Sequence, residues 1–399
     1  MTAAARSRRA PWFGRAALAE VLAAVAVAAF VTPAARADLP ADVGTAAPPA
    51  ATLPTPPGKH WVWVNDFVFP HMSDGMAYLV DGDSGRYLGT LSTGFGFARL
   101  VLPRDGKLIY APETYFSRGT RGVRTDVITI YDAATLKPAG EIEIPAKRAS
   151  NIPNIGNAEL TDDDRFLLVY NFNPAQSVSV VDMASRAFVG EVETPGCALA
   201  YPTGPRSFFS ICADGGLLAV QLDDAGRVAR QSRTEPLLDV AQDPVTEKPV
   251  RGGDTWYFVS FAGQVRTVRS GANGLEAGER WWLSTKAERA AGWRPGGVQQ
   301  LAYHAGQRRL YAIMHQGPIE THKDPGRSIW VADVTTHKRV AQIRTRRLAS
   351  AIQLTRDDQP LLFSVFIEGN VLDVYDPVSG RLLRSVPEIG TSPTLLLTP

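Results

Sequence analysis

Two features are scarce in this sequence of 399 residues, cysteine and long apolar runs, and both limit the class of protein it can be. It has only two cysteines, Cys197 and Cys212, which are too few for a small disulfide-stapled scaffold or a cysteine-rich zinc site. After residue 37, no apolar run reaches the roughly 20 residues that a membrane-spanning helix needs. We therefore expect the main part of the chain to be a soluble globular protein with no membrane segment.

The sequence also lacks an excess of charge and the short motifs of common catalytic sites. Its 42 Lys and Arg nearly balance its 40 Asp and Glu, so nothing indicates binding to nucleic acid. Its six histidines are scattered without an HxH or HExxH motif, and no GxSxG elbow, P-loop or dinucleotide fingerprint occurs. We predict no metal site, no cofactor site and no catalytic residue in this chain.

The first 37 residues have the composition of a secretory signal peptide. Several arginines precede a mostly apolar stretch from Ala16 to Val31, which Glu20 interrupts, and Ala35-Arg36-Ala37 fits a small-x-small cleavage site. We predict export to the periplasm with cleavage near Ala37. The pair Arg8-Arg9 leaves the choice between the general secretory and the twin-arginine route open.

Residues 38–58 are rich in Pro and Ala and nearly devoid of large apolar side chains. Such a segment buries too little surface to offset the entropy of ordering it, so we expect a flexible arm. Residues 59–399 alternate short β-rich runs with turns of Gly, Asp, Asn and Pro, and no segment keeps a helical period. This part is predicted to be one all-β domain.

One phrase recurs along this domain: an apolar run, an Asp, a turn and a second strand. It predicts hairpins, five of them clear and two weaker. The anchor positions are Asp81, Asp132, Asp182, Asp223, Ser270, Asp333 and Asp376, which are 41 to 63 residues apart. That spacing is close to a four-stranded blade, and most repeats carry a further strand signal after a charged turn, as in "TDDDRFLLVY" at 161.

Seven such repeats predict a seven-bladed β-propeller, with a chain of β-sandwiches as the competing architecture. Blades cannot bury their faces alone, so they close into a ring. Closure requires the ends of the domain to meet, and we expect "HWVWVND" near residue 60 to pair with "SPTLLLTP" at 392 in one blade.

The two cysteines fall within the fourth repeat. In an oxidising compartment they are expected to form a disulfide between neighbouring strands of one blade, worth roughly 3 kcal/mol in the loop-closure model. Two buried free thiols are the alternative.

Aromatic residues concentrate in "WVWVNDFVFP" at 61 and "STGFGFARL" at 92. Their alternation suggests that half of the rings point away from the core, either as packing or as an apolar lip against a partner or substrate. Trp281-Trp282 is expected to lie in a strand with one ring buried on each side. Asp126 is expected to form a structural ion pair with Arg124 or Arg121 and to have no catalytic role.

Four segments in order resemble the heavy subunit of the quinoprotein amine dehydrogenases, which act on methylamine or on aromatic amines. They are "YFSRGTRGVRTDVITIYDAATLKP" at 115, "NPAQSVSVVD" at 173, "PRSFFSICADGGLLAVQLDDAGRVARQSR" at 205 and "AERAAGWRPGGVQQLAYH" at 287. The resemblance covers essentially the whole mature chain. It implies a seven-bladed propeller with an intrablade disulfide between Cys197 and Cys212.

The resemblance also implies that catalysis belongs to a complex. In this family a disulfide-rich light subunit carries tryptophan tryptophylquinone, and the assembly is an α2β2 heterotetramer. It oxidises a small primary amine to aldehyde and ammonia and passes electrons to a blue copper protein, azurin or amicyanin. With two cysteines this chain is not that light subunit, and Trp281-Trp282 is not its quinone pair.

In the family a phenylalanine of the first-repeat loop lies at the entrance of the substrate channel. The matching loop of this sequence supplies Phe69 and Phe67, with Phe97 and Phe95 nearby, and Phe69 is the best match. Segments such as "FVFPHM" at 67 are closer to the aromatic-amine branch, so arylalkylamines are expected over methylamine. Two other functions stay open: a stand-alone propeller that binds ligands or proteins, and an enzyme with a site in its own central channel.

Overall fold

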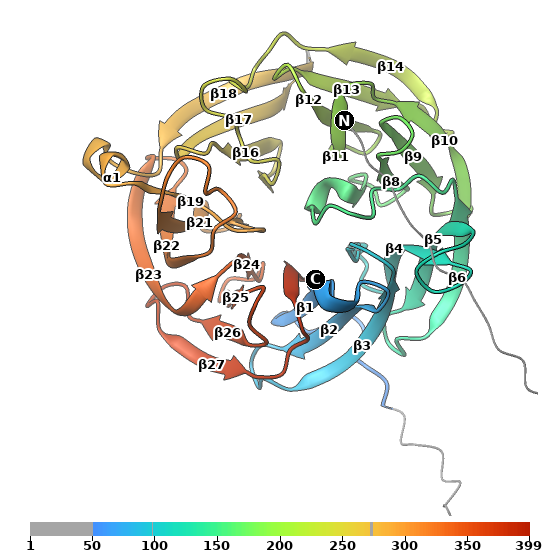
Figure 1. The fold of residues 1–399 in the computed structure, drawn as a ribbon, viewed down its shortest axis with the longest axis horizontal. Helices are drawn as coiled ribbons and strands as arrows, with labels where there is room; N and C mark the ends of the chain where they lie inside the picture. The colour runs from blue at the N-terminus through green and yellow to red at the C-terminus, as the bar shows by residue number, and fades with distance from the viewer. Residues whose placement is uncertain (1–50, 98, 272–273) are drawn as a thin grey trace, which may run out of the picture. The chain divides into compact units, whose positions relative to one another are not determined.

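The computed structural model describes residues 51–399 except 98, 272 and 273, and its compact unit begins at Ala51. The predicted signal peptide, residues 1–37, and residues 38–50 of the predicted arm lie outside the described residues. Seven sheets form a ring around a central axis, as Figure 1 shows. The predicted all-β class and the seven-bladed β-propeller are thereby confirmed.

The blades run in chain order around the ring, and the strands of each blade are named from the axis outwards. Blade 1 has β28 (Pro393–Leu397), β1 (Trp61–Asp66), β2 (Gly75–Asp81) and β3 (Tyr87–Gly94); blade 2 has β4 (Leu108–Phe116), β5 (Arg124–Asp132) and β6 (Pro138–Ile144); blade 3 has β7 (Ala158–Leu160), β8 (Phe166–Asn171), β9 (Ser177–Asp182) and β10 (Ala187–Glu193). In blade 2 the innermost position is reduced to a bridge between Val101 and Tyr110.

The remaining blades follow the same plan. Blade 4 has β11 (Cys197–Gly204), β12 (Ser207–Cys212), β13 (Leu217–Leu222) and β14 (Val228–Arg233); blade 5 has β15 (Val250–Gly252), β16 (Thr255–Val259), β17 (Gln264–Gly271) and β18 (Gly274–Trp282); blade 6 has β19 (Trp293–Pro295) and β20 (Leu301–His304) beside β21 (Arg309–Gln316), then β22 (Gly326–Asp333) and β23 (Lys338–Ala349); blade 7 has β24 (Ala351–Leu354), β25 (Leu362–Val365), β26 (Leu372–Tyr375) and β27 (Leu382–Val386). The short helices are α1 (Lys286–Ala290), η1 (Phe69–His71) and η2 (Ile155–Asn157).

The seven predicted hairpins are the two outer strands of the seven blades. The recurring Asp lies at the start of the turn, and its carboxylate accepts hydrogen bonds from backbone N–H groups of the turn. Asp333, for example, accepts from the N–H groups of Thr335 and Thr336, both at 2.8 Å. Four residues after that Asp the chain takes a positive φ, 58° at His337. This is the hairpin geometry in which a turn is followed by a left-handed residue.

The ring closes as predicted, because the first and last strands of the domain share blade 1. β1 pairs with β28 in antiparallel register, with Trp63 opposite Leu397 and Asn65 opposite Leu395. His60, just before β1, links blade 1 to blade 7 through Asp83 at 2.8 Å and Asp357 at 3.2 Å.

The cysteines form the predicted disulfide within blade 4. Cys197 is the first residue of β11 and Cys212 the last of β12, and the register places them opposite each other. Both lie in the largest buried apolar cluster, beside Tyr201 and Phe209. The bridge therefore fixes the innermost strand pair of that blade.

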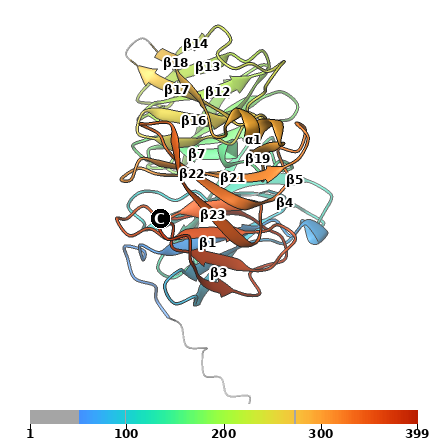
Figure 2. The same ribbon diagram turned by 90° about the vertical axis from the view of Figure 1, so that its left-hand side faces the viewer.

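The ring has two faces, seen edge-on in Figure 2. One face is formed by the turns between the third and fourth strands of each blade and by the turns between the first and second strands; we call it the hairpin face. The linker face is formed by the turns between the second and third strands and by the segments that lead from one blade to the next. Residues 51–58 lie on the hairpin face: the Leu53 N–H donates to Ala134 O at 2.8 Å, and Pro57 packs on Gly106.

The expectation that both Trp281 and Trp282 are buried is confirmed for Trp281 and wrong for Trp282. Trp281 is buried and stacks on His337 of the next blade, with ring centroids 5.1 Å apart. Trp282 is 39% exposed, because β18 is the outermost strand of its blade. The Arg289 guanidinium lies over the Trp282 ring, 4.0 Å from its centroid.

Candidate functional site

Three of the four phenylalanines predicted to line a substrate channel gather on the linker face. Phe67 and Phe97 are buried in a small apolar cluster with Leu395, whereas Phe69 is 39% exposed. The ring of Phe97 lies 4.9 Å from that of Phe67 and 5.3 Å from that of Phe69, centroid to centroid. Phe69 thus rests on a buried aromatic base and presents an apolar surface outwards.

The turn that carries Phe69 is fixed by one buried carboxylate. Asp66, at the end of β1, accepts hydrogen bonds from the backbone N–H groups of Val68 at 2.9 Å, Thr391 at 2.5 Å and Ser392 at 2.8 Å. The Phe69 N–H donates to the Ser392 hydroxyl at 3.2 Å. The turn after the first strand is therefore tied to the segment before the last strand.

This arrangement imposes two backbone conformations. Val68 has a φ of 45°, which is strained for a β-branched residue and persists because its N–H is held by Asp66. Gly390 has a φ of 70°, and a Cβ there would lie 2.3 Å from the nearer Asp66 carboxylate oxygen. Only glycine allows the chain to pass so close to that carboxylate.

Phe95 does not belong to the same group of rings. It packs against Phe116, with centroids 5.1 Å apart. Arg148 lies between the two groups, since its guanidinium donates to Phe95 O at 3.0 Å and to Phe97 O at 3.4 Å. Burial lowers the pKa of Arg148 to about 10. The predicted set of four therefore forms two ring groups joined through one buried cation.

Blade 2 supplies the polar support behind these rings. Asp126 is fully buried and forms the predicted ion pair with Arg124 through two bonds of 2.7 and 2.8 Å. It also accepts hydrogen bonds from the Arg148 backbone at 2.9 Å and the Thr114 hydroxyl at 2.8 Å. With every approach to the carboxylate occupied, Asp126 has a structural role.

Glu113 was not singled out from the sequence. It is fully buried on β4 and accepts hydrogen bonds from the hydroxyls of Thr129 and, at 2.8 Å, Tyr115. Burial raises the pKa of Glu113, while these hydrogen bonds and the charge of Arg148 oppose the shift. Glu113 thereby fixes Tyr115, which is 42% exposed.

Exposed apolar side chains continue across the linker face of the first three blades. Phe69 lies in the turn of blade 1, Tyr115 and Val123 flank the turn of blade 2, and Phe172 begins the turn of blade 3. Their exposed fractions are 39, 42, 73 and 39%. We call these four residues the apolar rim. Exposed apolar groups that succeed one another over adjacent loops are typical of an interaction surface.

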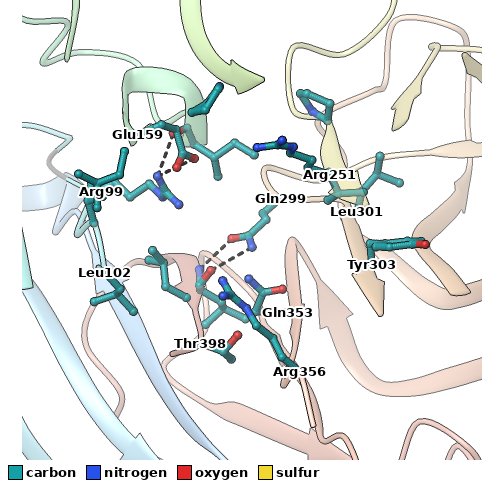
Figure 3. Close-up of a pocket in the computed structure, with 18 of the residues that line it drawn as sticks. Arg99, Leu102, Glu159, Arg251, Gln299, Leu301, Tyr303, Gln353, Arg356 and Thr398 are labelled. Atoms are coloured by element: carbon teal, nitrogen blue, oxygen red, sulfur yellow. Dashed lines mark hydrogen bonds and ion pairs between the residues drawn. The ribbon is translucent and has the colours of Figure 1, made fainter. Parts of the chain in front are cut away.

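A cavity of about 410 Å³ lies at the axis on the hairpin-face side, shown in Figure 3. Arginine and glutamine side chains extend into it, and one of its three carboxylates, Glu159, forms an ion pair with Arg99 at 2.9 Å. Burial raises the pKa of Glu159 against the opposing charge of Arg99. The described residues contain no group of His, Cys, Asp and Glu side chains that could hold a metal ion.

Four of the described tryptophans are held in packing contacts. Trp281 and Trp282 are engaged by His337 and Arg289. Trp293 and Trp330 do approach each other, at 5.2 Å, but Trp330 is 2% exposed within the core of blade 6.

Comparison with known proteins gives the context for these features. The family model described as methylamine dehydrogenase heavy chain matches residues 59–399. The chain belongs to this family. It is 30% identical to the methylamine dehydrogenase heavy chain of Methylobacillus flagellatus over 96% of this chain and 98% of that one. It is 31% identical to that of Methylorubrum extorquens over 96% and 95% of the two chains.

Solved structures at low identity share the propeller fold. A functionally unknown protein from Desulfotomaculum acetoxidans superposes with a TM-score of 0.58 at 10% identity, over 85% of this chain and 98% of that one. Dihydro-heme d1 dehydrogenase NirN gives 0.53 at 16% identity, over 85% and 75%. The family match therefore confirms the predicted resemblance to amine dehydrogenase heavy subunits, and the low-identity likenesses add only the fold.

The role of Asp66 can be tested by Asp66→Asn, which keeps the shape but turns an amide towards N–H donors. We expect the free energy of unfolding to fall by at least about 2 kcal/mol, since a hydrogen bond to a charged group contributes roughly 1.5–3 kcal/mol. Denaturant unfolding measures this. Asp74→Asn, in the same loop but exposed, is the control and should change little. Equal stability of Asp66→Asn and the unmodified protein would contradict the assigned role.

Proposed function

We propose that this chain is the large subunit of a periplasmic amine dehydrogenase that depends on tryptophan tryptophylquinone in a separate light subunit. The complex would oxidise primary amines to aldehyde and ammonia and pass the electrons to a blue copper protein, azurin or amicyanin. The family membership over residues 59–399 carries this proposal.

Export is part of the same proposal. The predicted signal peptide, with cleavage near Ala37, would deliver the chain to the periplasm, where the disulfide of Cys197 and Cys212 can form. The helices of the described residues are all too short to cross a membrane.

The apolar rim is proposed as part of the surface that receives the light subunit in an α2β2 assembly. An obligate interface of this kind usually buries more than about 2,000 Å², and the linker face offers exposed apolar groups from three adjacent blades. Within the assembly, the bound quinone supplies the two-electron chemistry. The heavy chain supplies position and an apolar entrance that excludes water.

Phe69 is proposed to shape that entrance, with Phe67 and Phe97 beneath it and Phe95 beside them. Its ring is the exposed member of the cluster and its backbone is fixed through Asp66 and Ser392, so its position is well defined. An aromatic lip favours substrates that carry an aromatic ring. We therefore propose arylalkylamines, such as phenylethylamine or tyramine, over methylamine, the substrate named in the curated relatives.

The docking surface is tested by placing a charge on it. We expect Val123→Asp to reduce by at least about tenfold the amount of light subunit that co-purifies from the host, because a carboxylate would be buried against the partner. Val378→Asp is the matched control, since Val378 is 77% exposed but lies in an outer-hairpin turn of blade 7. Equal co-purification of the two variants would reject this surface. A preparation in which no small partner accompanies even the unmodified chain would favour the stand-alone binding propeller.

Substrate choice is tested by Phe69→Ala. We expect kcat/KM for phenylethylamine to fall relative to that for methylamine by about tenfold, the effect of losing one aromatic contact of roughly 1–1.5 kcal/mol. Subunit assembly should be unchanged. Tyr87→Ala, an exposed aromatic on the outer strand β3, serves as the control. An unaltered ratio across a panel of amines would remove Phe69 from the entrance.

A further inference from the structure

The hairpin-face end of the channel contains two neighbouring cavities. The axial one has a volume of about 410 Å³, and the other, of about 280 Å³, lies near the axis between blades 1 and 2. Four residues line both of them: Leu102, Arg104, Arg356 and Thr398. The two cavities therefore lie side by side, with these four residues between them.

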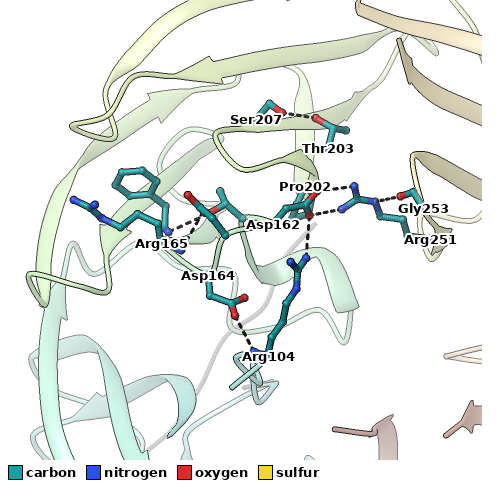
Figure 4. Close-up of polar contacts among 12 residues, drawn as sticks. Arg104, Asp162, Asp164, Arg165, Pro202, Thr203, Ser207, Arg251 and Gly253 are labelled. Atoms are coloured by element: carbon teal, nitrogen blue, oxygen red, sulfur yellow. Dashed lines mark hydrogen bonds and ion pairs between the residues drawn. The ribbon is translucent and has the colours of Figure 1, made fainter. Parts of the chain in front are cut away.

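The axial cavity carries more positive than negative side chains. Five basic and three acidic residues line it. Two of the acids are already engaged: Glu159 with Arg99 at 2.9 Å, and Asp162 with Arg251 through bonds of 2.5 and 2.8 Å. Figures 3 and 4 show these pairs. The third, Asp164, accepts a hydrogen bond from the Arg104 backbone at 2.8 Å.

Two of the five basic residues, Arg104 and Arg356, lie at the shared wall. The side chain of Arg356 forms no ion pair or hydrogen bond with any described residue, the terminal carboxylate of Pro399 included, and Figure 3 shows it extending into the axial cavity. Arg104 comes only within 3.7 Å of Asp162. Arg356 is an exposed residue, but crowding by its neighbours partly desolvates the guanidinium and lowers its pKa; the charges of Arg104 and Arg99 lower it further against the effect of Glu159. Arg356 is solvent-exposed and forms no ion pair with a described residue, so its guanidinium is available to a ligand.

Away from this wall the second cavity is lined mainly by apolar side chains, with Lys59 and the C-terminal residue Pro399 also in its lining. Trp61, Trp63, Leu79, Leu108 and Pro57 line it. An apolar cavity of about 150 Å³ is enough to bind benzene. The second cavity, at about 280 Å³, therefore has room for an aromatic ring or a branched alkyl group.

We propose that these two cavities form a binding site for an organic monocarboxylate that carries an aromatic or branched alkyl group. The carboxylate accepts hydrogen bonds from the Arg356 guanidinium with Arg104 beside it, and the apolar group fills the second cavity. The site lies on the face opposite the apolar rim. It requires neither the light subunit nor amine oxidation, so it stands or falls separately from the proposed function.

The proposal is tested by isothermal titration calorimetry on the protein as purified from its host, with any subunit that accompanies it. The probes are phenylacetate, acetate, inorganic phosphate and the neutral 2-phenylethanol. We expect phenylacetate to bind at least about tenfold more tightly than each of the others, because only it fills both cavities.

Three variants connect that binding to the site. Arg356→Gln should weaken phenylacetate binding at least about tenfold, and Arg356→Lys should fall between, because lysine keeps the charge without the paired donors. Arg381→Gln, an exposed arginine in a turn of the same face, is the control and should bind as the unmodified protein does.

Four results would overturn the proposal. Equal binding of phosphate, acetate and phenylacetate would show a site for small anions only. Equal binding of 2-phenylethanol would show an apolar cavity only. Undiminished binding by a folded Arg356→Gln, with an unchanged melting temperature, would place the carboxylate elsewhere. The absence of measurable phenylacetate binding would remove the site altogether.

Discussion

The pairing of β1 with β28 is the constraint on which both faces of this propeller depend. On the linker face, Asp66 at the end of β1 binds the backbone on both sides of the junction and so fixes the turn that carries Phe69. On the hairpin face, the other end of the same strand pair brings Trp63 and Thr398 into the walls of the cavities. A shift in this register would move the candidate entrance and the cavity together.

The two faces have different chemistry. The linker face of the first three blades presents the apolar rim, backed by the buried groups Glu113 and Arg148. The axial opening on the hairpin face is lined by arginines. A primary amine is a cation at neutral pH, so the arginine-lined opening would disfavour its approach. Under the two proposals, the rim would receive a partner subunit with its amine substrate, and the cavity would receive an anion.

The sequence predicted what local pattern determines. The repeated Asp predicted the hairpin turns, the β-rich segments at the two ends of the domain predicted the closure of the ring, and the two nearby cysteines predicted the disulfide. All three predictions were confirmed. Features that depend on which blades meet were not predictable. Arg356 of blade 7 lies beside Arg104 and Arg99 of blade 2 only once the ring has closed. Within blade 2, Glu113 is buried and bound by Tyr115 and Thr129, contacts that no motif of the sequence marks. Trp282 is exposed because β18 is an outermost strand, which alternation along the sequence does not reveal.

The central claim is that this chain contributes shape and position while a companion subunit contributes the reactive group. The most direct measurement compares amine-dependent dye reduction by the complex from the host periplasm with that by the isolated heavy chain, alongside their visible spectra. The account predicts quinone absorption and dye reduction for the complex and neither for the heavy chain alone. Amine-dependent dye reduction by the pure heavy chain would contradict it.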